Sequence, residues 1–495
     1  MSGDPGLESS AQRDSTATRD RSAVVIGAGL TGLAAAWRLL SEGWQTTLVE
    51  ASSRLGGCME TVELEGYRIE TGPNTVIADP IFDRLREIAA PFAPANAFRP
   101  LEEPILAAAA ARRRWVVFQG RLQALPASPP ALITSPLLST GAKLRLAGEP
   151  WRRGPDAHSG PDSGPDPQES VASFFDRRLG PQVRHRIGDA MVTGIYAGDP
   201  EELAIGAAFP KIHQLEKEAG SLIRGMLARR RAAKRSGNPL PKRRILGFPS
   251  GFGPWAEALG DAFQRAGGTL LRERPVRGLH KLPSGAGDAP RFEVQLDEGD
   301  PLPAHQVILA LPQESSRNLL QSVNQQAGLS PLPELLPNAP VAVLSLGVPT
   351  SAIEVPLNGF GFLAPHQEQR NILGCLVSSA LFAGRAPEGR TLLTVMIGGR
   401  RRPGLVQRPD DELLKLVRDE LEALLGLSTG APHDFALLRR WLPGIPQPTA
   451  DWFAHGEAYG QLEEKLPGLT ILGGWRHGVS LPDCARHGWA LGSDA

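Results

Sequence analysis

The most informative stretch of the chain reads Ala23-Val24-Val25-Ile26-Gly27-Ala28-Gly29-Leu30-Thr31-Gly32. Its first four residues form an apolar run, which predicts a buried parallel strand. The residues after it, Leu33–Leu40, are strong helix formers, and Gly43 closes the predicted helix. A second strand is predicted over Gln45–Glu50. The sequence therefore predicts a βαβ unit at the start of a doubly wound domain.

Three glycines of this stretch have the spacing that a bound dinucleotide requires. Gly27 permits the tight turn, Gly29 lets the backbone approach a pyrophosphate, and Gly32 allows the helix to pack closely on the strand. The free N–H groups at the start of the helix then face the phosphates. A carboxylate at the end of the second strand accepts hydrogen bonds from ribose hydroxyls and repels a 2′-phosphate. The expected dinucleotide contacts are Gly27, Ala28, Gly29, Leu30, Thr31, Gly32 and Glu50.

The residues after Glu50 favour FAD over NAD. Ala51 leads into Arg54, whose charge can neutralise a pyrophosphate. The glycine pair Gly56 and Gly57 permits backbone contact with the second half of the dinucleotide. Alone, this pair is consistent with an ordinary turn, but after the upstream glycine fingerprint it favours a flavin.

The composition narrows the classes of protein. The 495 residues correspond to roughly two to four domains at about 100–200 residues each. Lys plus Arg and Asp plus Glu number 53 each, so the formal charge is zero. A balanced charge excludes a globally basic nucleic-acid binder and gives no bulk attraction to anionic lipid. Three distant cysteines exclude a disulfide scaffold or a zinc module and indicate a reducing compartment.

The N-terminal residues 1–20 are polar and partly acidic, so we expect a disordered tail and neither a signal nor a transit peptide. No run reaches about 18 apolar residues, so no transmembrane helix is expected. These features predict a cytoplasmic protein, or one attached to a membrane from the cytoplasmic side. The sequence has no HExxH, P-loop or GxSxG pattern, and its histidines lack ligand spacing. We therefore expect no metal site.

Several motifs resemble one family of flavoproteins. The N-terminal block and Gly72-Pro73-Asn74-Thr75 resemble the amine-oxidase-like FAD family, and Gly473–Cys484 resembles its C-terminal flavin motif. The resemblance extends, more narrowly, to the oxygen-dependent protoporphyrinogen oxidases of that family. It covers about Ser22 to Leu491. The narrower motifs are Thr193–Pro200, Ala207–Lys211, Gly359–Leu363 and Ile372–Pro387.

The resemblance implies an α/β fold with three parts. They are a Rossmann-like FAD-binding domain, a substrate domain built on a mixed or antiparallel sheet, and a helical membrane-binding insertion. The implied boundaries are 21–80, 246–312 and 445–495 for the FAD-binding domain, 81–125 and 313–444 for the substrate domain, and 126–245 for the insertion.

The membrane assignment of the insertion depends on the resemblance. As bare sequence, the apolar residues of Pro126–Trp151 read as core, and the basic run Ala228–Arg244 reads as a solvated face. The resemblance instead implies that both belong to a peripheral membrane face. It also implies a homodimer, which no pattern in this chain shows.

The resemblance implies a chemistry as well. Protoporphyrinogen IX would be oxidised to protoporphyrin IX in heme or chlorophyll biosynthesis, losing six electrons in three two-electron steps at N5 of a non-covalent FAD, with O2 as the acceptor. No side chain is assigned a catalytic role. Three alternatives stay open: oxidation of coproporphyrinogen III, another amine-oxidase-like flavoenzyme such as an amine oxidase or carotenoid desaturase, and a non-catalytic tetrapyrrole-binding flavoprotein.

The family's propionate-binding arginine precedes a strand that begins aromatic-Val. The matching stretch here is Arg114–Leu122, so the resemblance implies that Arg114 binds a propionate of the substrate. An exposed arginine without this role is the simpler interpretation of the same residue.

Other residues match the family's substrate pocket. Phe360, Leu363 and Leu376 correspond to apolar residues that sandwich the macrocycle, although without the resemblance the two leucines would read as routine core. Gly194 matches a glycine at the back of the pocket. Met396 stands where relatives often have Phe, and its thioether can still pack on a π face.

Further cofactor contacts follow from the resemblance. The backbone of Val276 would meet the adenine, although an edge-strand valine is an equally good interpretation. This chain has Gly474-Trp475 where the family often has Asn-Tyr, which puts a side-chain contact at Gly474 in doubt. The implied cofactor contacts are Gly72, Pro73, Asn74, Thr75, Val276, Gly474, Val479, Ser480 and Leu481.

Overall fold

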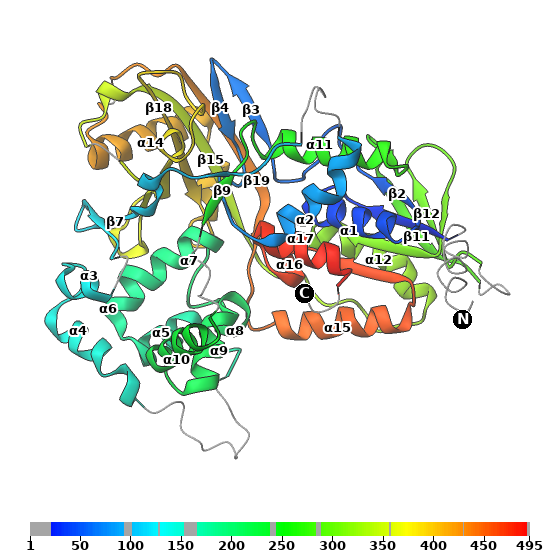
Figure 1. Cartoon of the computed structure of the whole chain (residues 1–495), viewed down its shortest axis with the longest axis horizontal. Helices are drawn as coiled ribbons and strands as arrows, with labels where there is room; N and C mark the ends of the chain where they lie inside the picture. Colours follow the sequence, from blue (N-terminus) through cyan, green and yellow to red (C-terminus); the bar gives the residue numbers. More distant parts are fainter. Residues whose placement is uncertain are drawn as a thin grey trace, which may run out of the picture.

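The computed structural model describes most of the chain. The expected tail, residues 1–20, lies outside the described residues, as do parts of Arg152–Ser170 and of Ala228–Arg244. Figure 1 shows a parallel sheet between helices, a second sheet that carries α14, and a cluster of helices below the second sheet. The described residues are 21–93, 101–126, 129–152, 166–237, 244–283, 289–355, 358–428 and 430–492.

Five parallel strands form the first sheet, in the spatial order β10-β2-β1-β14-β20. Helix α1 (Leu30–Ser41) connects β1 to β2, which confirms the predicted βαβ unit. The remaining strands come from distant parts of the sequence. The five strands are β1 (Ser22–Ile26), β2 (Gln45–Val49), β10 (Thr269–Leu271), β14 (Gln306–Ala310) and β20 (Leu469–Leu472).

Helix α1 is almost entirely buried because other backbone segments pack directly against it. A Cβ at Gly32 would lie 1.8 Å from the carbonyl oxygen of Gly27, so only glycine fits. Helix α17 (Leu481–Ala490) crosses α1 at Gly488, where a Cβ would lie 2.2 Å from the carbonyl oxygen of Thr31. This crossing brings the C-terminal residues next to the N-terminal glycine loop.

Helices and small sheets surround this core. A two-stranded sheet, β3 (Thr61–Leu64) and β4 (Tyr67–Glu70), follows β2. The other elements are α2 (Pro80–Ala89), α11 (Phe252–Arg265), α12 (Gln313–Gln326), α15 (Trp452–Lys465), α16 (Gly474–His477), and the strands β5 (Val76–Ile77), β6 (Ile105–Leu106), β9 (Ile245–Gly247), β11 (Val276–Lys281), β12 (Phe292–Leu296) and β13 (Leu302–Ala304).

The second sheet has seven strands, in the order β19-β15-β18-β17-β16-β7-β8. Neighbouring strands are antiparallel except β16 and β7, which run parallel. This mixed sheet agrees with the predicted fold class. Its strands are β7 (Trp115–Phe118), β8 (Arg121–Ala124), β15 (Asn338–Pro349), β16 (Gly361–Leu363), β17 (Ile372–Val377), β18 (Arg390–Gly398) and β19 (Phe435–Pro446).

One face of this sheet is covered by α14 (Asp410–Leu425), and we call it the α14 face. Phe362, Cys375 and Val395 are cross-strand neighbours on this face and are at most 2% exposed. They share a core with the apolar stripe of α14, whose buried residues recur at the spacing of one helix face. The buried residues of that stripe are Leu413, Val417, Leu421, Leu424 and Leu425.

Side chains alternate along a strand, so the adjacent residues point to the opposite face. Leu363, Gly374 and Met396 form one cross-strand row there, and Leu376 lies two residues beyond Gly374. Helix α7 (Asp189–Tyr196) lies against this surface, where Ala190 and Leu363 belong to the same apolar cluster. We call it the α7 face.

Helix α7 belongs to the cluster of helices drawn below the second sheet in Figure 1. The fully buried ion pair of Arg178 with Glu149 lies in this cluster, and Glu149 also accepts hydrogen bonds from Ser221 at the N-terminus of α10. The other elements are α3 (Pro129–Thr134), α4 (Thr140–Ala147), α5 (Val171–Arg178), α6 (Pro181–Val183), a π-helical turn (Arg184–Gly188), α8 (Ile205–Ala208), α9 (Pro210–Ala219) and α10 (Leu222–Arg235).

The stretch Pro126–Trp151 is partly core and partly exposed. Leu137 and Leu138 are buried, whereas Leu144 and Trp151 are 70% and 82% exposed. Within the described ranges, every helix is too short or too polar to span a bilayer.

Candidate active site

The glycine loop between β1 and α1 leaves open space in front of the helix. Gly27 adopts a φ of +97°, and its N–H donates to the carbonyl of Val49 at 2.8 Å. A Cβ at Gly29 would meet no atom within 4 Å. The helix N-terminus therefore opens onto unfilled space at the position where the fingerprint predicts a pyrophosphate. Leu30 and Thr31 are buried in the first turn of α1 behind this space.

The carboxylate of Glu50 is held at the end of β2. One oxygen accepts the N–H of Ala28 at 2.8 Å, and the other accepts the N–H and the hydroxyl of Ser52 at 2.9 and 2.8 Å. Glu50 is thereby fixed beside the glycine loop, and Ala51 follows it. Gly56 donates its N–H to the carbonyl of Ala28 at 2.8 Å, which brings the second glycine pair to the same loop.

Arg54 carries an unsatisfied buried donor. Its Nε lies 3.5 Å from Glu60, but its Nη1 is buried and has no hydrogen-bond acceptor among the described residues. A Cβ at Gly57 would lie 3.3 Å from the Cα of Gly29, so the glycine pair packs on the open loop. A guanidinium with a spare donor beside exposed glycine backbone fits the diphosphate of FAD.

The loop Gly72–Thr75 joins the cofactor region to the second sheet. The side-chain oxygen Oδ1 of Asn74 accepts a hydrogen bond from the hydroxyl of Ser378 at 2.9 Å, and that hydroxyl lies 2.9 Å from the hydroxyl of Thr394. The indole N–H of Trp441 donates to the carbonyl of Thr71 at 2.8 Å. Sequence analysis did not identify Ser378, Thr394 or Trp441, because their role depends on contacts between segments far apart in the chain.

The segment that leads into Val276 contacts the end of β2 and the residues after it. Backbone N–H groups of Glu273 and Arg274 donate to the carbonyls of Ser52 and Glu50, so the segment entering Val276 runs beside the glycine-rich region.

The C-terminal motif lies between β20 and α17. Ser480 caps α17 by accepting the N–H of Asp483 at 3.2 Å, and Val479 and Leu481 flank it. Gly474 begins the short helix α16. Burial, together with the neighbouring Arg476 and His487, lowers the pKa of His477 to about 3, so this imidazole is neutral at physiological pH.

The structure brings three of the predicted substrate residues to one surface. Leu363, Leu376 and Met396 all lie on the α7 face and are partly exposed. A Cβ at Gly194 would lie 3.0 Å from the Leu363 side chain, so this fourth residue meets the same surface from α7. Thr394 lies opposite Leu376 on that face. The hydroxyl chain of Ser378 therefore connects the surface directly to Asn74.

Phe360 and Arg114 form a separate edge of this region. The Arg114 guanidinium lies 5.0 Å from the centre of the Phe360 ring, a cation–π contact. The N–H of Phe360 donates to the carbonyl of Arg113 at 2.8 Å, which holds the two segments together. Phe360 precedes β16 and packs with Leu381 and Phe382, so it does not belong to the row of Leu363.

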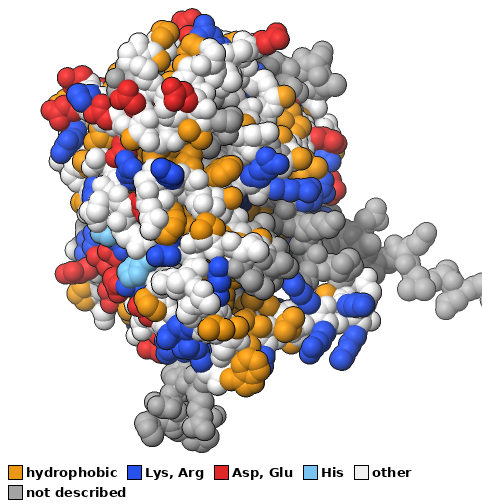
Figure 2. Space-filling model, turned by 90° about the vertical axis from the view of Figure 1, so that its left-hand side faces the viewer, with side chains coloured by type: hydrophobic (Ala, Val, Ile, Leu, Met, Phe, Trp, Pro, Cys, Tyr) orange, Lys and Arg blue, Asp and Glu red, His pale blue; other side chains and the backbone are white. Residues whose placement is uncertain are grey.

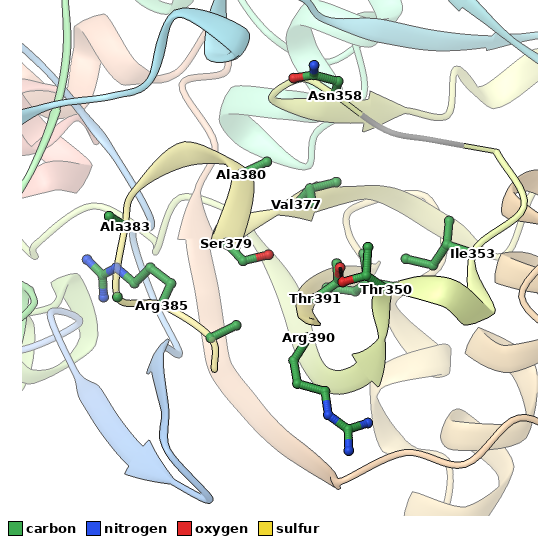
Figure 3. Close-up of a pocket in the computed structure, with 13 residues that line it drawn as sticks. Thr350, Ile353, Asn358, Val377, Ser379, Ala380, Ala383, Arg385, Arg390 and Thr391 are labelled. Atoms are coloured by element: carbon green, nitrogen blue, oxygen red, sulfur yellow. Dashed lines mark hydrogen bonds between the residues drawn. The ribbon is translucent and has the colours of Figure 1, made fainter. Parts of the chain in front are cut away.

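A pocket of about 530 Å³ lies elsewhere, around Thr350, Asn358 and Arg390 (Figure 3). Val377 and Leu393 line it and belong to the α14 face. It contains none of the predicted site residues. Across the described segments, no group of three or more His, Cys, Asp or Glu side chains could hold a metal ion.

Two characterised oxidases are similar to this chain over most of its length. A coproporphyrinogen III oxidase from Propionibacterium freudenreichii is 30% identical over 94% of this chain and 89% of its own length. Protoporphyrinogen oxidase 2 of Arabidopsis thaliana is 30% identical over 92% of this chain and 90% of its own length.

Solved structures share the fold. A crystal structure of an Exiguobacterium protein assigned as a protoporphyrinogen oxidase superposes with a TM-score of 0.73, at 21% identity, over 95% of this chain and 98% of the other. Cyclohexylamine oxidase from Brevibacterium oxydans superposes with a TM-score of 0.62, at 15% identity, over 96% of this chain and 98% of the other.

The family model for flavin-containing amine oxidoreductases matches residues 30–490. This range begins at the first residue of α1, directly after the open glycine loop, and includes the Gly72–Thr75 loop and the C-terminal motif at α17. The chain therefore belongs to the family of flavin-containing amine oxidoreductases, and it is an oxidoreductase whose cofactor is FAD.

Proposed function

We propose that this chain oxidises a porphyrinogen, with protoporphyrinogen IX as substrate and protoporphyrin IX as product, in heme or chlorophyll biosynthesis. One observation carries the proposal. Part of the apolar surface of the α7 face is exposed, at Leu363, Leu376 and Met396. The hydroxyl groups of Thr394 and Ser378 connect that surface to Asn74, in the loop Gly72–Thr75 that is expected to contact FAD. A large apolar macrocycle can lie on such a surface next to the cofactor.

The chain's own residues would bind and orient the substrate. Arg114 would pair with a propionate through charge-assisted hydrogen bonds, and its contact with the Phe360 ring restrains the guanidinium. Gly194 would let the backbone of α7 approach the macrocycle closely, because a Cβ there would lie 3.0 Å from the Leu363 side chain. Bound FAD would supply the two-electron acceptor for each of the three oxidations, with O2 as the final acceptor.

The predicted division of the chain is part of this proposal. Segments 21–80, 246–312 and 445–495 would bind FAD, and their expected contacts include Arg54, whose buried Nη1 lacks an acceptor. Segments 81–125 and 313–444 would bind the porphyrinogen. Segment 126–245 would provide α7 as one wall of the site.

A second substrate is coproporphyrinogen III. It is supported by the relatives that carry that name, from Propionibacterium freudenreichii at 30% identity and from Bacillus subtilis at 27%. This substrate carries four propionates where protoporphyrinogen IX carries two, so it would require more cations around the site than Arg114 alone.

The deciding experiment compares the two substrates. The purified protein is examined for flavin absorption bands, and each porphyrinogen is then added in air while porphyrin fluorescence is followed. Flavin bands with preferential oxidation of protoporphyrinogen IX would support the main proposal. Preference for coproporphyrinogen III would select the second substrate. If neither porphyrin formed, both proposed substrates would be contradicted. Repeating the reaction without air tests the acceptor, because porphyrin formation that continues unchanged would rule out O2.

We also propose a peripheral membrane contact at the helical cluster. Figure 2 views the molecule from the left-hand side of Figure 1, and in its lower part hydrophobic side chains gather beside Lys and Arg. Met226 and Leu227 on α10 are 47% and 42% exposed and precede basic residues of the same helix. Each basic residue near an anionic bilayer contributes about 1 kcal/mol. Sedimentation with anionic vesicles should remove the protein from solution, whereas neutral vesicles should not.

A homodimer, implied by the resemblance, is tested by sedimentation velocity.

A further inference from the structure

Helix α7 packs against the partly exposed residues of the α7 face. Its Gly194 meets Leu363, and the next residue, Ile195, is 45% exposed. A π-helical turn, Arg184–Gly188, leads directly into α7. The position of α7 relative to the sheet is set by the contacts that its two ends make with neighbouring segments.

One arginine in the turn after β18 contacts the first residue of α7 and a residue shortly beyond its last turn. Arg401 donates to Asp189, the first residue of α7, at 2.7 Å. Its Nη2 and Nε also lie 3.0 Å from the two carboxylate oxygens of Asp199, three residues beyond the helix. The second oxygen of Asp189 accepts the backbone N–H of His366, just after β16, at 2.6 Å. We call Arg401, Asp189 and Asp199 the α7 clamp.

The turn before Arg401 is built to approach α7 closely. Gly398 and Gly399 have φ values of +98° and +80°. A Cβ at Gly399 would lie 2.6 Å from the carbonyl oxygen of Ala197, and the N–H of Arg400 donates to that carbonyl at 2.8 Å. Because the turn follows β18, which carries Met396, the clamp joins α7 to the strand at the centre of the proposed substrate surface.

The clamp is partly withdrawn from water, so its charges matter. The Asp189 side chain is 5% exposed and that of Arg401 is 20% exposed. Burial opposes ionisation of Asp199, but hydrogen bonds from Arg401 and from the N–H of Glu201 outweigh it and hold the pKa of Asp199 below its usual value. Removal of one partner from such a pair leaves the others uncompensated, which displaces the segments they join.

We propose that Arg401 is a positioning residue that sets the separation of α7 from the sheet, and thereby which porphyrinogens the enzyme accepts. The inference rests on the proposed function, because it assigns the macrocycle to the space bounded by α7 and the row of Leu363. Arg401 itself would touch neither substrate nor FAD.

Arg400 supplies a matched control. It occupies the same turn and pairs with Glu202 through a contact whose partners are 35% and 41% exposed. Such a surface pair contributes roughly 0–1 kcal/mol and does not reach Asp189. Arg401→Gln and Arg400→Gln therefore remove the same charge from adjacent positions, but only the first opens the clamp.

The kinetic test uses the full-length, FAD-loaded protein. For Arg401→Gln we expect KM for the preferred porphyrinogen to rise about tenfold with kcat within twofold, because a displaced wall weakens the binding of substrate and transition state alike. The ratio of kcat/KM between protoporphyrinogen IX and coproporphyrinogen III should fall at least about threefold. Arg400→Gln should leave both quantities within twofold. Equal behaviour of the two variants would overturn the inference.

A second measurement does not depend on turnover. Spin labels are attached through Ile195→Cys on α7 and Arg121→Cys on β8, both exposed positions, in a Cys58→Ser, Cys484→Ser background. Arg401→Gln should broaden or shift the distance distribution, and Arg401→Lys should restore part of it. An unchanged distribution would overturn the inference even if the porphyrinogen proposal holds. A changed distribution in a protein that oxidises neither porphyrinogen would leave the clamp supported and the proposed function refuted.

If Arg401→Gln loses FAD or fails to fold, Asp199→Asn replaces it. This change removes charge at a partly exposed carboxylate and leaves the Asp189 contact in place. A rise in KM of about threefold, which on a logarithmic scale is half of the tenfold rise expected for Arg401→Gln, would support the clamp. KM within twofold of the wild type would contradict it.

Discussion

The two faces of the seven-stranded sheet are made by alternating residues of the same strands, yet they differ in how completely they are covered. On the α14 face, Phe362, Cys375 and Val395 are at most 2% exposed. Their neighbours along the chain, Leu363, Leu376 and Met396, are partly exposed on the α7 face. Both faces are apolar, so hydrophobicity alone does not mark the site. Incomplete coverage of apolar side chains next to a cofactor loop does.

The largest expected effect separates Phe362 from Leu363. Phe362→Ala should lower the free energy of unfolding by about 3–5 kcal/mol, because it empties a packed core. Leu363→Ala should cost less than about 1.5 kcal/mol, since its side chain is only partly buried, but it should raise KM for the porphyrinogen. Urea unfolding of the FAD-loaded variants measures the first difference, and steady-state kinetics measures the second. Equal losses of stability would remove the distinction between the faces.

The cofactor loop could be predicted from the sequence, whereas the distinction between the faces could not. Gly27 to Gly57 form one local βαβ unit and its following turn, so spacing along the chain fixes their geometry. The alternation of β16 and β17 predicts two faces but not which one α14 covers. Trp441 reaches Thr71 across 370 positions of sequence, and Arg401 reaches Asp189 across 212. No local pattern encodes such contacts.

The family resemblance identified some residues that local sequence patterns could not. It identified Leu363, Leu376 and Met396, which the structure places on one face. It did not identify the hydroxyl groups that connect this face to Asn74, because Ser and Thr occur at many positions and only the fold shows which of them meet.

The next largest effect is expected on substrate binding at Arg114, beside the α7 face. Arg114→Ala should raise KM for the porphyrinogen by about tenfold or more, since a hydrogen bond to a charged group is worth about 1.5–3 kcal/mol. The FAD content should not change. Arg112→Ala is the control, because Arg112 is an exposed arginine two residues away. Unchanged kinetics for Arg114→Ala would remove this residue from the site.

Two threonines of β18 test the comparison at single hydroxyl groups. Thr394 lies on the α7 face and contacts Ser378 at 2.9 Å, whereas Thr391 pairs with Thr350 at 2.9 Å near the other face. Replacement of either by Val should cost about 1 kcal/mol of stability. Only Thr394→Val should also weaken FAD retention, measured by dialysis and absorption, because it breaks the chain to Asn74. Equal loss of FAD from both variants would contradict a specific connection.

The smallest effect is expected from a test that compares how readily a thiol reagent reaches each face of the sheet in the folded protein. Burial raises the pKa of the Cys375 thiol to about 12, so very little of the reactive thiolate forms at pH 8. In a Cys58→Ser, Cys484→Ser background, a thiol reagent should leave Cys375 unmodified until the protein unfolds. Met396→Cys, on the adjacent strand but the α7 face, should react in the folded protein, and protoporphyrin IX should slow that reaction. Rapid modification of Cys375 would show that the α14 face opens in solution. Unimpeded modification at position 396 in the presence of the porphyrin would show that the macrocycle binds elsewhere, which makes this the most direct chemical test of which face of the sheet holds the substrate.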